Sequence, residues 1–353
     1  MNEIDKTLTK LIEKNKTPSV QYVIFDTNDI IHKFQGGFAD IKNKKETTKK
    51  TTYNAFSVTK TFTALAILQL AEQGMIDIEQ PAIKYLPDFP YPPEITIRQL
   101  LNHSSGIPNP IPLSWIHLAD EHASFDRNAF FNQVYTKNNT TKARPNEKYA
   151  YSNLGYVLLG QLIEKATGIS YEEFIRTNIL NPLKIDMTDM DFTLTNNHAK
   201  GYHKKYSLSN AILGFMIDKS IFVDTVEGKW NSFKDNYVNG ASYGGLIGTS
   251  DAFVKYVQEL LKPNGKLITN TYKKKLFLEN LTNNGKATGM CLSWFSGQLD
   301  GNQYFAHAGG GGGYYCEIRI YPDIGIGSVI MFNRTGMKDE RFLDKLDKYV
   351  TNK

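Results

Sequence analysis

Segments with the alternation typical of β-strands lie at the two ends of the chain. Residues 19–25 (SVQYVIF) and 29–37 (DIIHKFQGG) predict two strands joined by a turn at Asp26–Asn28. Strand patterns return from about residue 288, and a closing helix is expected over 338–350. The strands expected there are GMCLSWF (289–295), QYFAHAG (303–309), YYCEIRIYP (314–322) and GIGSVIMFN (325–333).

The middle of the chain has mainly helical periodicity. Apolar residues recur at helical spacing after Ser57, and Gly74 is placed to be the C-cap of that helix. The proline-rich segment 77–98 predicts an irregular crossing, and the segment 190–247 is rich in loop-forming residues. Further helices are expected over 97–102, 127–135, 153–167, 170–179 and 250–262.

This order of elements predicts an α+β fold. Strands that are distant in sequence pair most simply into one antiparallel or mixed sheet, and the helical middle then forms an insertion. We expect a sheet domain made of residues 1–95 and 260–353, flanked by helices, and a mainly helical insertion domain over 96–259.

Composition and charge limit the classes of function. The 353 residues are 41% hydrophobic and 22% charged, which is ordinary for one or two globular domains. The net charge of +5 is spread along the chain, so no nucleic-acid partner is expected. No segment approaches the roughly 20 apolar residues of a membrane helix. Residues 1–18 are typical of an amphipathic helix, not of a signal peptide, so the protein is expected in the cytoplasm unless an export signal was removed.

Cysteine usage argues against a metal centre. Cys291 and Cys316 lie in apolar, strand-like segments, where two buried thiols are the simpler interpretation and a disulfide would be geometrically demanding. No Cys/His cluster has metal-ligand spacing, so neither a metal nor another cofactor is expected.

Ser57 and Lys60 begin the helical segment NAFSVTKTFTALAILQLAEQG (54–74). The simplest interpretation is a helix cap followed by a solvated charge. Residues three apart share a helix face, however, so the Lys60 amine can reach the Ser57 hydroxyl. A helix N-terminus also offers free backbone N–H groups to a developing negative charge. The pair therefore has the parts of an activated nucleophile.

A second polar cluster precedes another apolar helix, in YAYSNLGYVLLG (149–160). Tyr151 can shuttle a proton, and Asn153 can hold both a lysine and a substrate carbonyl. The similar triplet at 237–239 lies in a loop-rich stretch with no helix to fix it, so Tyr151 is preferred.

The third cluster is His307, which is followed by Ala308 and the five glycines 309–313. The glycine run is either a flexible hairpin loop or a strand edge along which a substrate can lie close to the backbone. The sequence RTG at 334–336 follows the last expected strand and is set aside.

The three clusters in this order resemble the serine β-lactamase and penicillin-binding-protein-like hydrolases. The motifs are S-V-T-K, Y-S-N and H-A-G, similar to the branch with class C β-lactamases, D-Ala-D-Ala carboxypeptidases, D-aminopeptidases and family VIII carboxylesterases. The resemblance covers about residues 15–335. Other family-like text is LLNHSSGIP (100–108), GYVLLGQLIEKATGISYEEFI (155–175), GGLIGTSDAF (244–253) and VIMFNR (329–334).

The resemblance implies a β-lactamase/transpeptidase-like fold with the active site at the junction of the two domains. Ser57 would be the acylated nucleophile, Lys60 the amine beside it, and Tyr151 a general base or acid. Asn153 would orient Lys60 and the substrate carbonyl, and His307 would polarise Tyr151 or the substrate. The backbone N–H groups of Ser57 and Gly310 would form the oxyanion hole, and Gly309 would bind the substrate. The sequence leaves open whether Lys60 or Tyr151 takes the first proton.

Some features depart from the family pattern or allow two interpretations. Ala308 replaces the hydroxyl residue that helps many members hold a substrate carboxylate, which favours ester, amide or D-aminoacyl substrates over β-lactams. Tyr202 and Trp230 could wall a substrate pocket or pack under a long loop. His103 is interpreted as a structural histidine that bonds a loop.

Two functions from different classes follow. The first is a serine hydrolase that acts on a small-molecule or peptide-like substrate through an acyl-enzyme. The alternative is a penicillin-recognising binding or sensor protein that is acylated without efficient turnover. The oligomeric state stays open.

Overall fold

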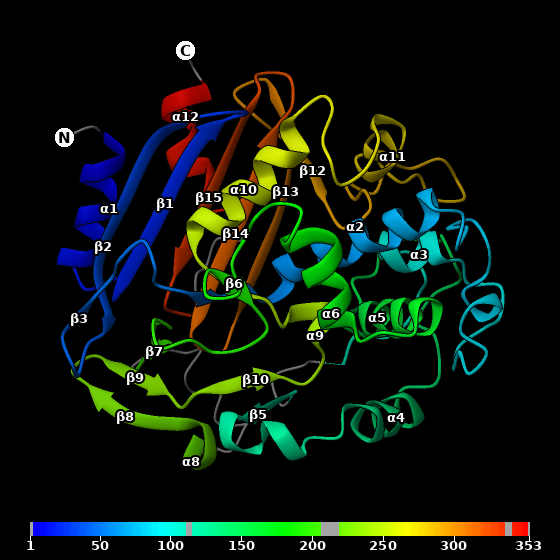
Figure 1. The fold of residues 1–353 in the computed structure, drawn as a ribbon, viewed down its shortest axis with the longest axis horizontal. Helices are drawn as coiled ribbons and strands as arrows, with labels where there is room; N and C mark the ends of the chain where they lie inside the picture. The colour runs from blue at the N-terminus through cyan, green and yellow to red at the C-terminus, as the bar shows by residue number, and fades with distance from the viewer. Residues whose placement is uncertain (1–2, 111–114, 206–218, 336–340, 352–353) are drawn as a thin grey trace.

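A seven-stranded antiparallel sheet joins the two ends of the chain (Figure 1). The structure is a computed structural model, and it describes residues 3–110, 115–205, 219–335 and 341–351. The strand order is β12-β13-β14-β15-β1-β2-β3, so strands from the C-terminal end pair directly with those from the N-terminal end. The strands are β1 (Ser19–Asp26), β2 (Ile30–Asp40), β3 (Lys45–Glu46), β12 (Phe295–Leu299), β13 (Asn302–Gly311), β14 (Tyr314–Tyr321) and β15 (Ile326–Phe332). The α+β fold with an antiparallel sheet is therefore confirmed.

The central strand pair shows how the pattern of side chains sets the layers. β1 and β15 pair with Val20 opposite Phe332 and Val23 opposite Val329. Because side chains alternate between the faces of a strand, Val20 and Val23 lie in different cores. Helices α1 (Glu3–Glu13) and α12 (Asp344–Thr351) cover the face of the sheet that carries Val20. Helix α10 (Ser250–Leu261) packs on the face that carries Val23.

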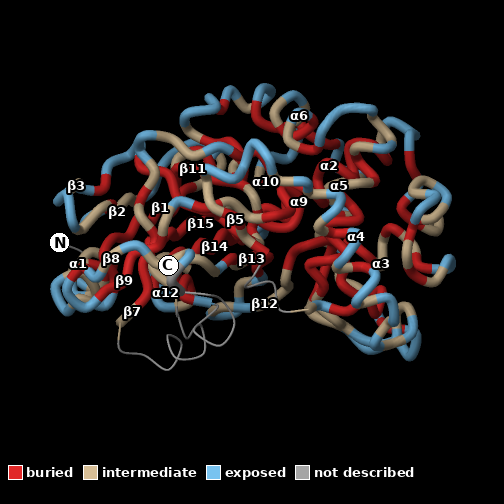
Figure 2. Tube along the Cα trace, turned by 90° about the horizontal axis from the view of Figure 1, so that it is seen from below, coloured by how far each residue is buried: buried red, intermediate tan, exposed pale blue. Residues whose placement is uncertain are grey.

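The helical part packs around α2 (Thr59–Glu72), whose residues 59–71 are all buried. A helix that is buried on every side must be surrounded by other elements, and α5 (Asn153–Thr167) and α9 (Ala241–Gly244) lie against it. Figure 2 shows the buried segments concentrated along the sheet and along α2, with exposed segments at the periphery. The other helices in the described part are α3 (Ile97–Leu101), α4 (Arg127–Lys137), α6 (Tyr171–Ile175), α8 (Lys219–Phe222), α11 (Asn270–Leu276), a π-helical turn at Arg176–Leu180, and the 3-10 turns η1 (Phe56–Val58), η2 (Ala82–Lys84) and η4 (Ala119–Ser124).

Short strands within the described residues form three small sheets beside the main one. Their orders are β4-β11-β6, β7-β9-β8 and β10-β5. The strands are β4 (Tyr53–Asn54), β5 (Ile116–Leu118), β6 (Met190–Asp191), β7 (Tyr202–Lys204), β8 (Val223–Glu227), β9 (Trp230–Phe233), β10 (Asn236–Val238) and β11 (Ile247–Gly248).

Two predicted elements differ from the structure. The strand expected over 289–295 is wrong, because β12 begins only at its last residue, Phe295. Gly289 (φ +70°) and Ser293 (φ +72°) are left-handed, which is incompatible with a regular strand. The closing helix α12 begins at Asp344, and residues 338–340 of the expected helix lie outside the described residues.

Other expectations have mixed outcomes. Cys291 and Cys316 are both free and buried, which confirms the simpler interpretation. The division into residues 1–95 plus 260–353 and 96–259 stays a prediction, and α10, which lies in the second range, packs against β1 and β15. Among the described helices, none is long and apolar enough to cross a membrane.

Candidate active site

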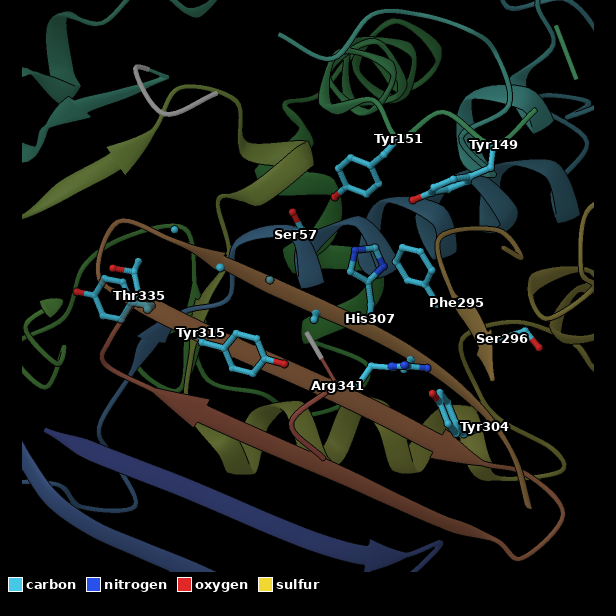
Figure 3. A pocket seen from close by; sticks show the side chains of 16 residues that line it. Ser57, Tyr149, Tyr151, Phe295, Ser296, Tyr304, His307, Tyr315, Thr335 and Arg341 are labelled. Atoms are coloured by element: carbon cyan, nitrogen blue, oxygen red, sulfur yellow. The ribbon is translucent and has the colours of Figure 1, made fainter. Parts of the chain in front are cut away.

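A cavity of about 1080 Å³ opens along β13 and faces the start of α2 (Figure 3). It brings together residues that are hundreds of positions apart in the sequence. The lining residues are Ser57, Tyr149, Tyr151, Phe295, Ser296, Tyr304, Ala306, His307, Ala308, Gly309, Gly310, Gly311, Tyr314, Tyr315, Thr335 and Arg341.

Ser57 lies in the 3-10 turn η1, which leads directly into α2. Neither η1 nor α2 has a side-chain cap hydrogen bond at its start, so the helix-cap interpretation of Ser57 is wrong. The preceding residue, Phe56, has φ +46°, a left-handed conformation that costs a non-glycine residue of the order of 1–3 kcal/mol. This strained turn sets the direction in which the Ser57 side chain enters the cavity.

Lys60 is fully buried below Ser57. Its Nζ forms hydrogen bonds with Ser57 Oγ at 3.1 Å and with the carbonyl oxygen of Tyr243 at 2.7 Å. The rings of Tyr151, Tyr156 and Tyr243 surround it, with centroids 5.1–5.5 Å from Nζ. Burial holds the pKa of this amine well below its ordinary value, because a buried ammonium loses its hydration. A neutral Lys60 can accept the Ser57 proton while it donates to the Tyr243 carbonyl.

Tyr151 points its hydroxyl toward Ser57 across the mouth of the cavity (Figure 3). It comes directly before Ser152, the N-cap of α5, whose side chain accepts from Gly155 N at 3.1 Å. Its position is therefore fixed by the start of a well-capped helix.

Asn153 is buried, but its hydrogen bonds in the described part of the structure lead away from Lys60. Its backbone N–H and its side-chain Nδ2 both donate to Asn109 Oδ1, at 3.0 and 3.1 Å. Its Oδ1 is buried without a hydrogen-bond partner among the described residues. The expected hydrogen bond between Asn153 and Lys60 is not found among the described residues.

His307 is neutral in this site. Its Nδ1 donates to the carbonyl oxygen of Ser293, which leaves Nε2 as a buried acceptor that no described residue contacts by a hydrogen bond. Burial, together with the nearby Lys60, lowers the pKa of His307 to about 3. The ring therefore carries no positive charge for a substrate carboxylate at neutral pH.

The glycine run forms the edge of the sheet beside Ser57. β12 pairs with β13 only up to Ala306, so residues 307–311 have an open edge on that side. A Cβ at Gly309 would lie 2.1 Å from Ala55 O and 2.7 Å from Ser57 N, so only glycine allows this approach. A Cβ added at Gly310 would meet no atom closer than 3.7 Å, and Gly310 lines the cavity. Residues 309–311 are thus a strand, not a flexible loop.

Tyr202 and Trp230 do not line this cavity. Tyr202 donates to Glu227 Oε2 at 2.8 Å, and Trp230 Nε1 donates to Asn15 Oδ1 at 2.6 Å. Both are buried in the small sheet β7-β9-β8, where they pack between elements. Of the two interpretations of Tyr202 and Trp230, packing between neighbouring elements describes their place in the structure, and walling this cavity does not.

The sequence reasoning missed the aromatic wall. Tyr314 and Tyr315 follow the glycine run directly, and Tyr304 alternates with Ala306 and Ala308 on β13, so strand periodicity could have indicated them. No local sequence pattern indicated that Arg341 lines the cavity, because this residue lies between the last strand of the sheet, β15, and helix α12. The missed aromatic residues are Tyr149, Phe295, Tyr304, Tyr314 and Tyr315.

Comparison with known proteins places this arrangement in a family. A family model described as Beta-lactamase matches residues 4–351. Penicillin-binding protein 4* of Bacillus subtilis is 29% identical over 305 residues, covering 84% of this chain and 63% of its own length. Protein flp of Staphylococcus aureus is 32% identical over 205 residues, covering 56% of this chain and 39% of its own length. The chain thus spans less than two thirds of these relatives.

Solved structures show the same fold. The octameric penicillin-binding protein homologue from Pyrococcus abyssi has a TM-score of 0.77 at 24% identity, covering 95% of this chain and 74% of that one. The D-amino acid amidase from Ochrobactrum anthropi SV3 has a TM-score of 0.77 at 22% identity, covering 97% of this chain and 93% of that one.

Proposed function

Because this chain belongs to the Beta-lactamase family, we propose that it is a serine hydrolase that works through an acyl-enzyme on Ser57. The observation that carries this proposal is the 3.1 Å hydrogen bond between Ser57 Oγ and the fully buried Lys60 amine. A buried amine whose pKa is lowered, next to a hydroxyl that caps no helix, is an arrangement that activates a nucleophile. A surface lysine beside a capping serine would not have this property.

The proposed reaction has two steps. Ser57 Oγ attacks the acyl carbon while its proton passes to Lys60 or Tyr151, and the same proton leaves with the departing alcohol or amine. Water then attacks the acyl-enzyme, and one of its protons passes through Lys60 or Tyr151 to Ser57 Oγ as the acid is released. The N–H groups of Ser57 and Gly310 would donate to the carbonyl oxygen as negative charge develops on it. Asn153 Oδ1 and His307 Nε2, which are both buried without a hydrogen-bond partner among the described residues, would act as acceptors for Lys60, Tyr151 or the substrate.

The cavity favours an apolar or aromatic acyl group that carries no positive charge. Five aromatic side chains beyond Tyr151 line it, and Arg341 is the one side chain with a permanent charge among the described lining residues. No Asp or Glu occurs in that described lining, so a free amino group on the substrate would find no carboxylate there. We therefore propose esters and N-acylated amides as substrates ahead of free D-aminoacyl amides.

Two features weigh against efficient β-lactam hydrolysis. Ala308 lines the cavity and has no hydroxyl to donate to a carboxylate, and the neutral His307 offers no charge. A lost hydrogen bond to a carboxylate costs about 1–3 kcal/mol of binding. A β-lactam could still acylate Ser57 slowly, which is the behaviour expected of a penicillin-recognising sensor.

A matched substrate panel tests the proposal. The panel contains a p-nitrophenyl ester, N-acetyl-phenylalanine amide and free phenylalanine amide in both configurations, and nitrocefin. We expect the ester and the N-acetylated amides to be cleaved faster than the free amides and nitrocefin, with Ser57→Ala inactive on all. Cleavage that is unchanged in Ser57→Ala would refute the acyl-enzyme. A β-lactam adduct that persists without turnover of any substrate would support the sensor instead.

A further inference from the structure

His103 contacts three consecutive residues around Tyr151. Its carbonyl oxygen accepts from Ala150 N at 2.7 Å, and its ring Nδ1 accepts from Ser152 N at 3.1 Å. Between these two bonds, its ring packs against the Tyr151 ring with centroids 4.2 Å apart. One side chain and its own carbonyl thus hold the backbone on both sides of Tyr151 and the face of its phenol.

The state of the imidazole follows from these bonds. Because Ser152 N donates to Nδ1, Nδ1 is unprotonated and the proton lies on Nε2. His103 is fully buried, and burial with the nearby Lys60 holds its pKa well below the ordinary value. The hydrogen bond from Ser152 N to His103 Nδ1 is therefore kept in mild acid. An exposed histidine would take up a proton on Nδ1 under those conditions and could no longer accept this hydrogen bond.

The backbone of His103 is itself constrained. It has φ +56°, in the left-handed region, directly after helix α3. The start of α3 is fixed by a capping box between Thr96 and Gln99. A strained conformation persists only where surrounding contacts determine it, and such residues cluster at functional sites.

The same short segment also reaches His307. The carbonyl of Leu101 accepts from Ser293 N at 3.0 Å, and Ser293 in turn accepts from His307 Nδ1. Ser293 also has a left-handed backbone, with φ +72°. The segment 101–103 thus connects two side chains of the candidate site, Tyr151 and His307, that come from distant parts of the chain.

We propose that His103 is a positioning residue that fixes Tyr151 relative to Ser57, and that the segment 101–103 sets the distance between Tyr151 and His307. This proposal rests on the proposed hydrolase function. His103 does not line the cavity, so it acts through Tyr151 and not on the substrate.

The variants are His103→Ala, which removes ring and acceptor, and His103→Asn, whose Oδ1 can accept from Ser152 N and which tolerates the left-handed backbone. Displacement of a reacting group by about 1 Å can cost about 100-fold in rate. We expect the rate constant for labelling by a fluorophosphonate to fall 10- to 100-fold in His103→Ala, with partial recovery in His103→Asn. His203→Asn is the control, because it removes a buried imidazole in β7 that does not line the cavity.

A double-mutant cycle with Tyr151→Phe separates positioning from general destabilisation. If His103 acts through the Tyr151 hydroxyl, His103→Ala should lower labelling by less than about 3-fold in the Tyr151→Phe background. An equal loss in both backgrounds, or wild-type labelling in His103→Ala, would overturn the proposal. Wild-type protein that is never labelled would instead refute the hydrolase function.

Amide hydrogen exchange provides a readout that needs no activity. The Ser152 N–H should be protected in wild type and in His103→Asn, and should exchange at least 10-fold faster in His103→Ala. Protection that is equal in all three proteins would show that the ring does not hold this loop. That result would overturn the positioning role whatever the enzyme hydrolyses.

Discussion

Gly309→Ala is the smallest change that separates β13 from the nucleophile. The added methyl group would lie 2.1 Å from Ala55 O, 2.7 Å from Ser57 N and 3.0 Å from Val58 N. All three are backbone atoms of the turn that carries Ser57, so no side-chain rotation can relieve the contact. The strand or the turn must move.

The size of that movement follows from the distances. Ordinary van der Waals contact begins near 3.4 Å, so the contact of 2.1 Å with Ala55 O requires a shift of more than 1 Å. A misplacement of about 1 Å at a reacting centre can lower the rate about 100-fold. Overpacking a well-packed core costs about 1–3 kcal/mol, so the folded state should survive. The expected variant is folded and at least 100-fold slower in labelling.

The assay compares Gly309→Ala with Gly155→Ala by fluorophosphonate labelling and by urea denaturation. Gly155 lies in α5, and its nearest atoms to an added Cβ are 3.8 Å away. Alanine also favours a helix by up to about 1 kcal/mol over glycine, so Gly155→Ala should retain wild-type labelling and stability or better. Wild-type labelling in Gly309→Ala would refute the close approach of β13 to Ser57.

Three further predictions concern buried titratable groups. The labelling rate should stay constant at pH values above the lowered pKa of Lys60 and should fall at lower pH, where the amine is protonated. In the unfolded chain Lys60 keeps its proton up to its ordinary, higher pKa. The free energy of unfolding should therefore rise with pH between the folded-state pKa and the unfolded-state pKa of Lys60. A labelling midpoint near the ordinary lysine value, measured with a pH series, would contradict a neutral amine. Since the pKa of His307 is lowered to about 3, wild type and His307→Gln should have pH–rate profiles of the same shape between about pH 5 and 8, whatever their absolute rates. Glu317→Ala should cost about 3–5 kcal/mol in urea denaturation, because it removes the 2.7 Å ion pair with the fully buried Arg319 guanidinium, whose remaining carboxylate partner is the half-buried Asp344. A loss as small as that of the exposed Glu46→Ala would argue against this contribution.

The sequence predicted the sheet because its strands have clear apolar patterns. β1 lies beside β15, as expected of strands at the two ends of one chain, and α5 begins and ends at the predicted residues 153 and 167. The segment 289–295 was predicted wrongly because its apolar residues fill a core without forming a strand. Its left-handed residues respond to tertiary contacts, which local patterns do not encode.

The candidate site was predicted unevenly for the same reason. Ser57, Tyr151 and His307 occur in short motifs, so their meeting at one cavity, with Lys60 buried behind Ser57, could be expected from a resemblance. The contacts of Asn153 and the aromatic wall depend on how side chains pack across elements. His103 illustrates the limit, because its sequence context predicted a structural histidine, whereas its contacts with Ala150, Tyr151 and Ser152 become visible only in the structure.

Intact-mass labelling with a fluorophosphonate tests the central claim most directly. Wild-type protein should gain the mass of one adduct, and peptide mapping should place that adduct on Ser57. Ser57→Ala should gain nothing, although urea denaturation shows the same stability. Equal labelling of both proteins, or none of the wild type, would contradict the claim that Ser57 is the nucleophile.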